Sequence, residues 1–232
     1  YQAEFVDVNR KTDWSIDEEA LLREAENAKL VILATPNNPT GNLLQPSLVE
    51  KLLKTNALIV LDEAYIEFSQ SSSMVNVACS HPSLIVLRTF SKWAGLAGLR
   101  IGYAVAHRRI IDAFMKTKQP YNVSAPSVAA AIASLKDIEE LDRRASILTA
   151  ERDRVFSILE KISWLKPFQS ETNFLLVRTV DRDAKGISDK LRREGIFIRT
   201  YSEDNIKDCI RISMGTSLQN DRVIEALSNI ER

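Results

Sequence analysis

The chain has 232 residues, of which 45% are hydrophobic, and its 31 lysines and arginines balance 31 aspartates and glutamates. Such a composition is typical of a globular protein with one large or two small cores. The zero net charge gives no electrostatic reason to expect nucleic-acid or anionic-membrane binding. Because no apolar run approaches the ~18 residues of a membrane span and no leader opens the chain, we expect a cytoplasmic protein.

Metal chemistry finds little support in the sequence. Cys79 and Cys209 lie far apart and the two histidines have no partner at ligand spacing, so we expect reduced cysteines and no metal site. Val60 to Glu63 resembles the apolar strand and acidic pair that hold magnesium in nucleotide hydrolases. The phosphate-binding loop G-x-x-x-x-G-K-[ST] is absent from the chain, which disfavours that interpretation.

The first half of the chain alternates helical patterns with short apolar runs. Ser15 to Glu18 has the spacing of a capping box, which predicts a helix over Asp17 to Ala28. Apolar runs bounded by polar and turn residues predict strands buried on both faces of a parallel α/β sheet, where ligands gather beyond the carboxyl ends of the strands. These strands are Lys29 to Ala34, Ala57 to Leu61 and Ser83 to Leu87, with a helix over Pro46 to Lys54 and a further strand over Leu99 to Val105.

The second half is richer in helix-forming residues. A helix is expected from about His107, and Ser124 to Ile162 predicts two helices, with the alternating charges from Lys136 to Arg154 on a solvated face. We expect residues 1–122 to belong to a large domain and residues 123–232 to hold connecting helices and a small α+β domain. Its predicted elements are strands over Asn173 to Val177, Ile196 to Ile198 and Cys209 to Ser213, a helix over Ala184 to Glu194, and a closing helix from about Gln219.

Polar residues at the predicted strand ends supply the parts of a pyridoxal-phosphate site. A lone lysine is usually a solvated surface residue, but Lys92 stands in a loop of small residues directly after a strand and could form a Schiff base with the cofactor. Asp62 could keep the ring nitrogen protonated. Tyr65 and Asn38 could donate to the phenolate oxygen, while Thr89, Ser91 and Arg100 could bind the phosphate.

Several motifs resemble the fold-type I pyridoxal-phosphate aminotransferases in order and spacing. The nearest resemblance is to the histidinol-phosphate aminotransferase branch, and it covers essentially the whole chain. The motifs are Pro36 to Gly41, Leu61 to Tyr65, Arg88 to Lys92 and Gly98 to Gly102, followed by Gln119 to Ser124, Thr172 to Leu175, Gly195 to Arg199 and Ile210 to Thr216.

The resemblance implies a transferase of histidine biosynthesis that exchanges an amino group between histidinol phosphate and 2-oxoglutarate or glutamate. It implies that Lys92 is the catalytic lysine and that Arg211 binds the anionic end of both substrates, assisted by Arg199. Asn173 and Tyr121 would line the substrate pocket. A homodimer is likewise implied by the family.

The resemblance also contains a departure, because Tyr1 to Val6 resembles a strand well inside the family's large domain. The family's N-terminal third, which brings the ring-stacking aromatic and further phosphate contacts, is then missing. We therefore expect a fragment that binds cofactor weakly alone and exposes a large apolar face. Alternatives are an aromatic or broad-specificity aminotransferase, threonine-phosphate decarboxylase, an inactive truncated product, or a chain that is only a dimerisation partner.

Overall fold

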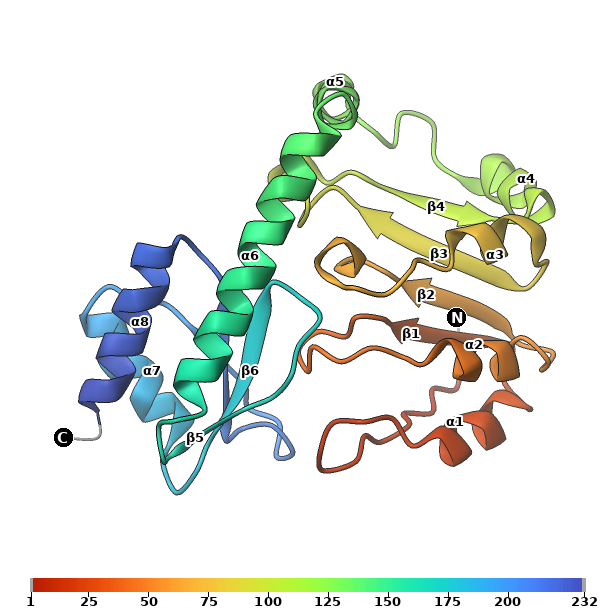
Figure 1. The fold of residues 1–232 in the computed structure, drawn as a ribbon. Coiled ribbons are helices and arrows are strands. Elements are labelled where there is room, and N and C mark those ends of the chain that lie inside the picture. The colour runs from red at the N-terminus through yellow and green to blue at the C-terminus, as the bar shows by residue number, and fades with distance from the viewer. Residues whose placement is uncertain (1, 231–232) are drawn as a thin grey trace. The chain divides into compact units, whose positions relative to one another are not determined.

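The computed structural model describes residues 2–230, which form two compact units (Figure 1). The first unit holds the residues up to 37 together with 42–66 and 71–138. The second holds 38–41, 67–70 and the residues from 139 onward, so two short segments of the first half belong to it. The expected boundary after residue 122, between the large domain and the connecting helices with the small domain, stays a prediction. Within the described residues no helix is both long and apolar enough to cross a membrane.

A four-stranded sheet in the order β1-β2-β3-β4 organises the first unit. The first three strands are parallel, as the buried apolar runs predict, whereas β4 runs antiparallel to β3. The hydrogen-bond register aligns Ala34 with Asp62 and Asp62 with Leu87, so the carboxyl ends of β1, β2 and β3 lie side by side. The strands are β1 (Leu30–Ala34), β2 (Leu58–Asp62), β3 (Leu84–Thr89) and β4 (Gly102–Ala106).

Three short helices cover one face of this sheet (Figure 1). Because side chains alternate along a strand, Ile59, Leu61 and Val86 point to this face and are buried against the helices. The opposite face is apolar and is uncovered within the unit at β1, where Leu30 is 48% exposed and Ile32 is 65% exposed, whereas Ile85 on the same face of β3 is buried. The covering helices are α1 (Glu18–Ala25), α2 (Pro46–Leu52) and α3 (Val75–Ser80), and single 3-10 turns lie at η1 (Ile66–Phe68) and η2 (Ala97–Leu99).

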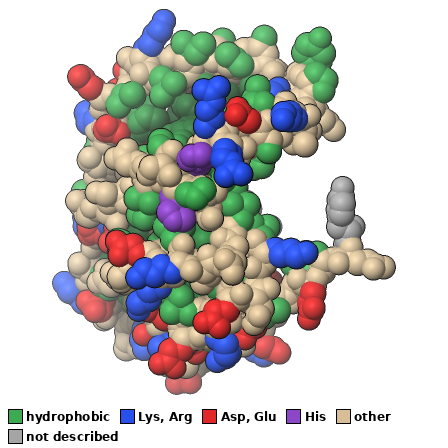
Figure 2. Space-filling model, turned by 90° about the vertical axis from the view of Figure 1, so that its right-hand side faces the viewer, with side chains coloured by type: hydrophobic (Ala, Val, Ile, Leu, Met, Phe, Trp, Pro, Cys, Tyr) green, Lys and Arg blue, Asp and Glu red, His purple; other side chains and the backbone are tan. Residues whose placement is uncertain are grey.

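The first unit ends in α4 (Arg108–Thr117) and α5 (Ala125–Leu135), both of which begin where the sequence predicts. His107 caps α4 through its side chain, and Ser124 caps α5 with a proline in the first turn. Apolar side chains remain at the surface of both helices, including Phe114, Met115 and Ile132. Figure 2 shows hydrophobic side chains at the surface in the upper part of the view, where α4 lies.

The second unit packs three helices against one face of an antiparallel sheet in the order β5-β6-β8-β7. Alternation along β6 and β8 directs Leu175, Val177, Ile210 and Ile212 into this core. Burial of so many large side chains supplies the main stabilisation of the unit. The elements are α6 (Ile138–Leu159), β5 (Leu165–Pro167), β6 (Phe174–Thr179), α7 (Ala184–Arg193), β7 (Arg199–Thr200), β8 (Cys209–Ser213) and α8 (Ser217–Asn229).

Three local expectations are wrong. The N-cap of α1 is Asp17, whose carboxylate accepts from the Ala20 amide, while the hydroxyl of Ser15 binds Asp13 instead of closing a capping box. The expected strand over Ile196 to Ile198 forms at Arg199–Thr200, because Gly195 with its positive φ and the backbone bond from Ile196 to Leu191 still belong to the helix end. The strand expected from Leu99 begins at Gly102, since Ala97–Leu99 forms η2.

Candidate active site

The carboxyl end of β2 carries Asp62, and the adjacent end of β3 carries Thr89. The register pairs Asp62 with Leu87, so alternation places Asp62 and Thr89 on the same face of the sheet, which is the uncovered one. The Asp62 carboxylate is half-buried and accepts a hydrogen bond from the Ala64 amide at 3.0 Å. A carboxylate fixed in this way keeps an oxygen available to a ligand at the sheet end.

The loop after β3 brings Lys92 close to Tyr65. The Nζ atom of Lys92 lies 5.4 Å from the centroid of the Tyr65 ring, a cation–π distance, while the ring is buried. Lys92 itself is exposed. Lysine, aspartate and tyrosine therefore gather at the neighbouring ends of two parallel strands, as the sequence predicts.

The predicted phosphate-binding residues are only partly assembled. The Thr89 hydroxyl accepts from the Ser91 amide at 3.0 Å and donates to the Ile101 carbonyl, which fixes the turn that leads to Lys92. Arg100 adopts a left-handed conformation with φ of 51°. Its guanidinium is exposed and donates to the Ala97 carbonyl, and within the described residues it makes no hydrogen bond to Thr89 or Ser91.

The second unit holds Asn38 and the predicted anion-binding arginines. An Nη of Arg211 donates to the Asn38 amide oxygen at 2.6 Å, and its guanidinium lies 4.9 Å from the centroid of the Phe174 ring. Arg199 stands directly opposite Arg211 in the β7–β8 ladder, so two guanidinium groups share one side of the sheet. Like charges in this position repel each other, and a bound anion would relieve the repulsion.

Two polar atoms beside these arginines lack partners within the described part of the chain: Nε of Arg211 and the hydroxyl oxygen of Tyr201, both buried. Burial raises the pKa of Tyr201, against the opposing effect of Arg211 and Arg199, so its hydroxyl stays a neutral donor. Tyr201 was not among the residues predicted from the sequence. The sequence does contain a signal for it: Tyr201 follows Arg199 by two residues, and in an extended chain such residues lie on the same side.

The remaining predicted pocket residues, Asn173 and Tyr121, belong to the second and the first unit respectively. Asn173 precedes β6, and its carbonyl accepts from the Met214 amide. Tyr121 lies in the segment between α4 and α5 with its side chain 98% exposed and a φ of 59°. Their roles as pocket residues stay predictions.

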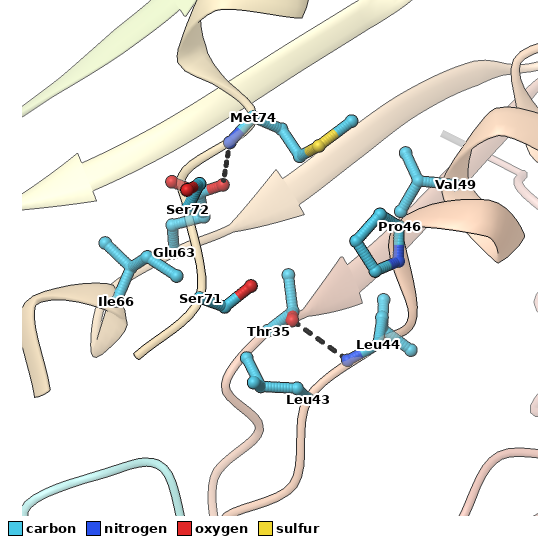
Figure 3. A pocket seen from close by; sticks show the side chains of 10 residues that line it. All are labelled: Thr35, Leu43, Leu44, Pro46, Val49, Glu63, Ile66, Ser71, Ser72 and Met74. Atoms are coloured by element: carbon cyan, nitrogen blue, oxygen red, sulfur yellow. Dashed lines mark hydrogen bonds between the residues drawn. The ribbon is translucent and has the colours of Figure 1, made fainter. Parts of the chain in front are cut away.

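A buried polar cluster that the sequence analysis overlooked lies directly after Asp62. Figure 3 shows the Glu63 side chain in a small pocket of the first unit, hydrogen-bonded to the Met74 amide. Glu63 is 1% exposed and forms an ion pair with Arg88. The sequence offers one signal for this cluster: Glu63 directly follows Asp62, and Arg88 directly precedes Thr89, so an acidic and a basic residue flank two neighbouring strand ends. Residues 2–230 contain no group of His, Cys, Asp or Glu side chains able to hold a metal ion.

Comparison with known proteins defines the fold class first. The structure of histidinol-phosphate aminotransferase from Sinorhizobium meliloti in complex with pyridoxal-5'-phosphate matches with a TM-score of 0.87 at 35% identity, over 98% of this chain and 64% of that one. L-threonine-O-3-phosphate decarboxylase from Porphyromonas gingivalis matches with a TM-score of 0.81 at 25% identity, over 89% and 66%. The predicted α/β fold of the fold-type I transferases is confirmed.

The sequence comparisons then give the family. The model described as aminotransferase class I and II matches residues 1–227, and the chain belongs to this family. It is 42% identical over 235 aligned residues to histidinol-phosphate aminotransferase from Roseiflexus castenholzii. That match includes 99% of this chain and 63% of the relative, so the chain spans less than two thirds of the length of this curated relative.

Proposed function

We propose that the chain forms the larger part of a pyridoxal-phosphate-dependent aminotransferase that acts on histidinol phosphate and on 2-oxoglutarate or glutamate. The observation that carries the proposal is the position of the Lys92 amine, 5.4 Å from the Tyr65 ring centroid at strand ends that also hold Asp62. An amine, a carboxylate and a phenol are the donor set that this cofactor needs. The family and the name of the Roseiflexus relative support the same function.

Each proposed role follows from the chemistry of the side chain. Bound pyridoxal phosphate supplies an electron sink for the carbanion at the substrate Cα. Asp62 holds a proton on the ring nitrogen, and Tyr65 and Asn38 donate hydrogen bonds to the ring oxygen. Thr89, Ser91 and Arg100 bind the phosphate, which requires the exposed Arg100 side chain to leave its contact with Ala97.

Lys92 is the proposed general acid and base. Once its amine is free, it takes the proton from the substrate Cα and returns it at C4′ of the cofactor. Arg211, with Arg199, binds the phosphate of one substrate and the carboxylate of the other, because a guanidinium fork accepts either anion. Asn173 and Tyr121 line the substrate pocket in this proposal.

Replacement of Lys92 tests the catalytic proposal. In the protein at its full encoded length, Lys92→Ala should abolish transamination while leaving non-covalent cofactor binding, whereas Lys54→Ala, at an exposed lysine of the same unit, should leave turnover unchanged. Retained transamination in Lys92→Ala would end the assignment.

The substrate is tested separately. Turnover with histidinol phosphate, phenylalanine and threonine phosphate should favour histidinol phosphate. The second candidate, threonine-phosphate decarboxylase, is supported by the match to the Porphyromonas enzyme and would release carbon dioxide from threonine phosphate. Preference for phenylalanine would indicate the aromatic or broad-specificity alternative.

We further propose a homodimer, with the exposed apolar side chains of α4 and α5 as part of the surface that a second copy covers. Analytical ultracentrifugation should give twice the chain mass at micromolar concentration. A cytoplasmic location stays a prediction.

A further inference from the structure

A network of three side chains connects the ends of β2 and β3 on the side of the sheet opposite Asp62. Glu63 Oε1 accepts from the Met74 amide at 2.8 Å, and its Oε2 accepts from the Ser73 hydroxyl. An Nη of Arg88 lies 3.6 Å from Glu63 Oε2 and donates to the Ser73 hydroxyl at 3.3 Å. The Glu63 amide also donates to the Leu87 carbonyl at 2.9 Å. These contacts join the two strand ends to each other and to the segment before α3.

Two members of the network are sequence neighbours of proposed cofactor contacts. Glu63 directly follows Asp62, and Arg88 directly precedes Thr89. Alternation sends Asp62 and Thr89 to the uncovered face, whereas Arg88 shares the helix-covered face with the buried Val86. Movement of Glu63 or Arg88 would therefore rotate a strand end that carries a cofactor contact.

The burial of the pair makes it sensitive to the loss of either partner. Glu63 is almost fully buried, and the Arg88 side chain is only slightly exposed. Removal of one member of a buried ion pair leaves an uncompensated charge. Separation of the two side chains would incur a similar free-energy cost, and this cost holds them in one arrangement. An apolar contact could join the two strand ends without the desolvation cost of buried charges. It would not fix the rotation of the strands as strictly, because hydrogen bonds are directional and apolar contacts are not.

We propose that Glu63, Arg88 and Ser73 are positioning residues that fix the ends of β2 and β3 so that Asp62 and the Lys92 loop meet the same cofactor ring. None of the three is placed against the cofactor: Glu63 and Arg88 act through their sequence neighbours Asp62 and Thr89, and Ser73 acts through its hydrogen bonds to Glu63 and Arg88. The inference rests on the proposed pyridoxal-phosphate function and adds residues that act behind the site. Residues that orient metal ligands change metal affinity about 10-fold to 100-fold when they are replaced, and we expect an effect at the lower end of this range for a cofactor held by more contacts.

The test measures pyridoxal phosphate binding by absorbance titration in the protein at its full encoded length. Glu63→Gln and Arg88→Met should each raise the dissociation constant about tenfold, and each should shift the pH midpoint of the absorbance of the bound cofactor. Arg88→Lys should recover part of the affinity. In the double variant the combined loss should be smaller than the product of the two single losses, because both replace the same interaction.

Matched controls separate positioning from general stability. Glu50→Gln makes the same substitution at an exposed site of the unit and should bind like the wild type. Ser73→Ala removes one hydroxyl of the network and should weaken binding about threefold, whereas Ser72→Ala, at its exposed neighbour, should not. The serine variants keep the test open if the charge variants do not fold.

The outcomes distinguish this inference from the function on which it rests. If the wild type binds the cofactor at Lys92 and the variants lose thermal stability but keep the wild-type dissociation constant and pH midpoint, the network is only structural and the inference is wrong. If the wild type itself does not bind pyridoxal phosphate, the proposed function fails and this inference fails with it.

Discussion

Arg152 offers a quantitative test of how the second unit holds a segment from the first half of the chain. It lies on α6 with 6% exposure, and one Nη donates to the carbonyl of Phe68 at 3.2 Å and to that of Thr172 at 3.0 Å. A hydrogen bond from a charged donor contributes roughly 1.5–3 kcal/mol. Arg152→Met keeps the apolar packing and removes both bonds together with the bond from Nε to the exposed Asp153, while relief from burying a charge offsets part of the loss.

We expect Arg152→Met to lower the free energy of unfolding by about 2–4 kcal/mol. Urea denaturation followed by circular dichroism measures it, with the slope of the transition checked for constancy. Arg143→Met is the matched control, because Arg143 lies on the same helix, is exposed and pairs with Glu140 at the surface. Such a pair contributes about 0.2–1 kcal/mol. Equal effects of the two substitutions would refute the anchoring role of Arg152.

Two further predictions concern titration and reactivity. Arg154 first, and Asn220 next, lower the pKa of Glu151 to about 2, so its ionised form stabilises the fold above about pH 4.5 and this stabilisation is lost as the pH falls toward 2. The difference in unfolding free energy between wild type and Glu151→Gln should therefore shrink between pH 5 and about pH 2, and a constant difference would contradict this. Burial raises the pKa of Cys209 to about 12, so iodoacetamide at pH 8 should label the exposed Cys79 and spare Cys209 in the folded protein; rapid labelling of Cys209 would show that it is accessible.

Local pattern predicts β1, β2, β3, β6, β8 and most helices, because each of them has a signal in its own residues. The apolar run of β2 needs no distant partner to be recognised. No pattern predicts the short elements β5 and α3, and β7 lies later in the chain than expected. The antiparallel direction of β4 is different, since the run of apolar residues is the same for either direction. Only the path of the chain around η2 decides it.

In the candidate site, too, some residues are predicted from local motifs, whereas other contacts depend on distant parts of the chain. Lys92, Asp62 and Tyr65 are predicted from the order of motifs and lie together in the first unit. The ion pair between Glu63 and Arg88 depends on the register of two strands, which their sequences do not contain. Arg152 lies in a stretch of alternating charges that predicts a solvated helix face, and for this residue the prediction is wrong because Phe68 and Thr172 fold over it.

The central claim is that Lys92 holds the cofactor. It is tested most directly by incubating the protein at its full encoded length with pyridoxal phosphate, reducing with sodium borohydride and mapping the labelled peptides by mass spectrometry. We expect one modified lysine per chain, at Lys92, with Lys54 and Lys118 unmodified at the same cofactor concentration. Modification at another lysine, or labelling spread evenly over the exposed lysines, would contradict it.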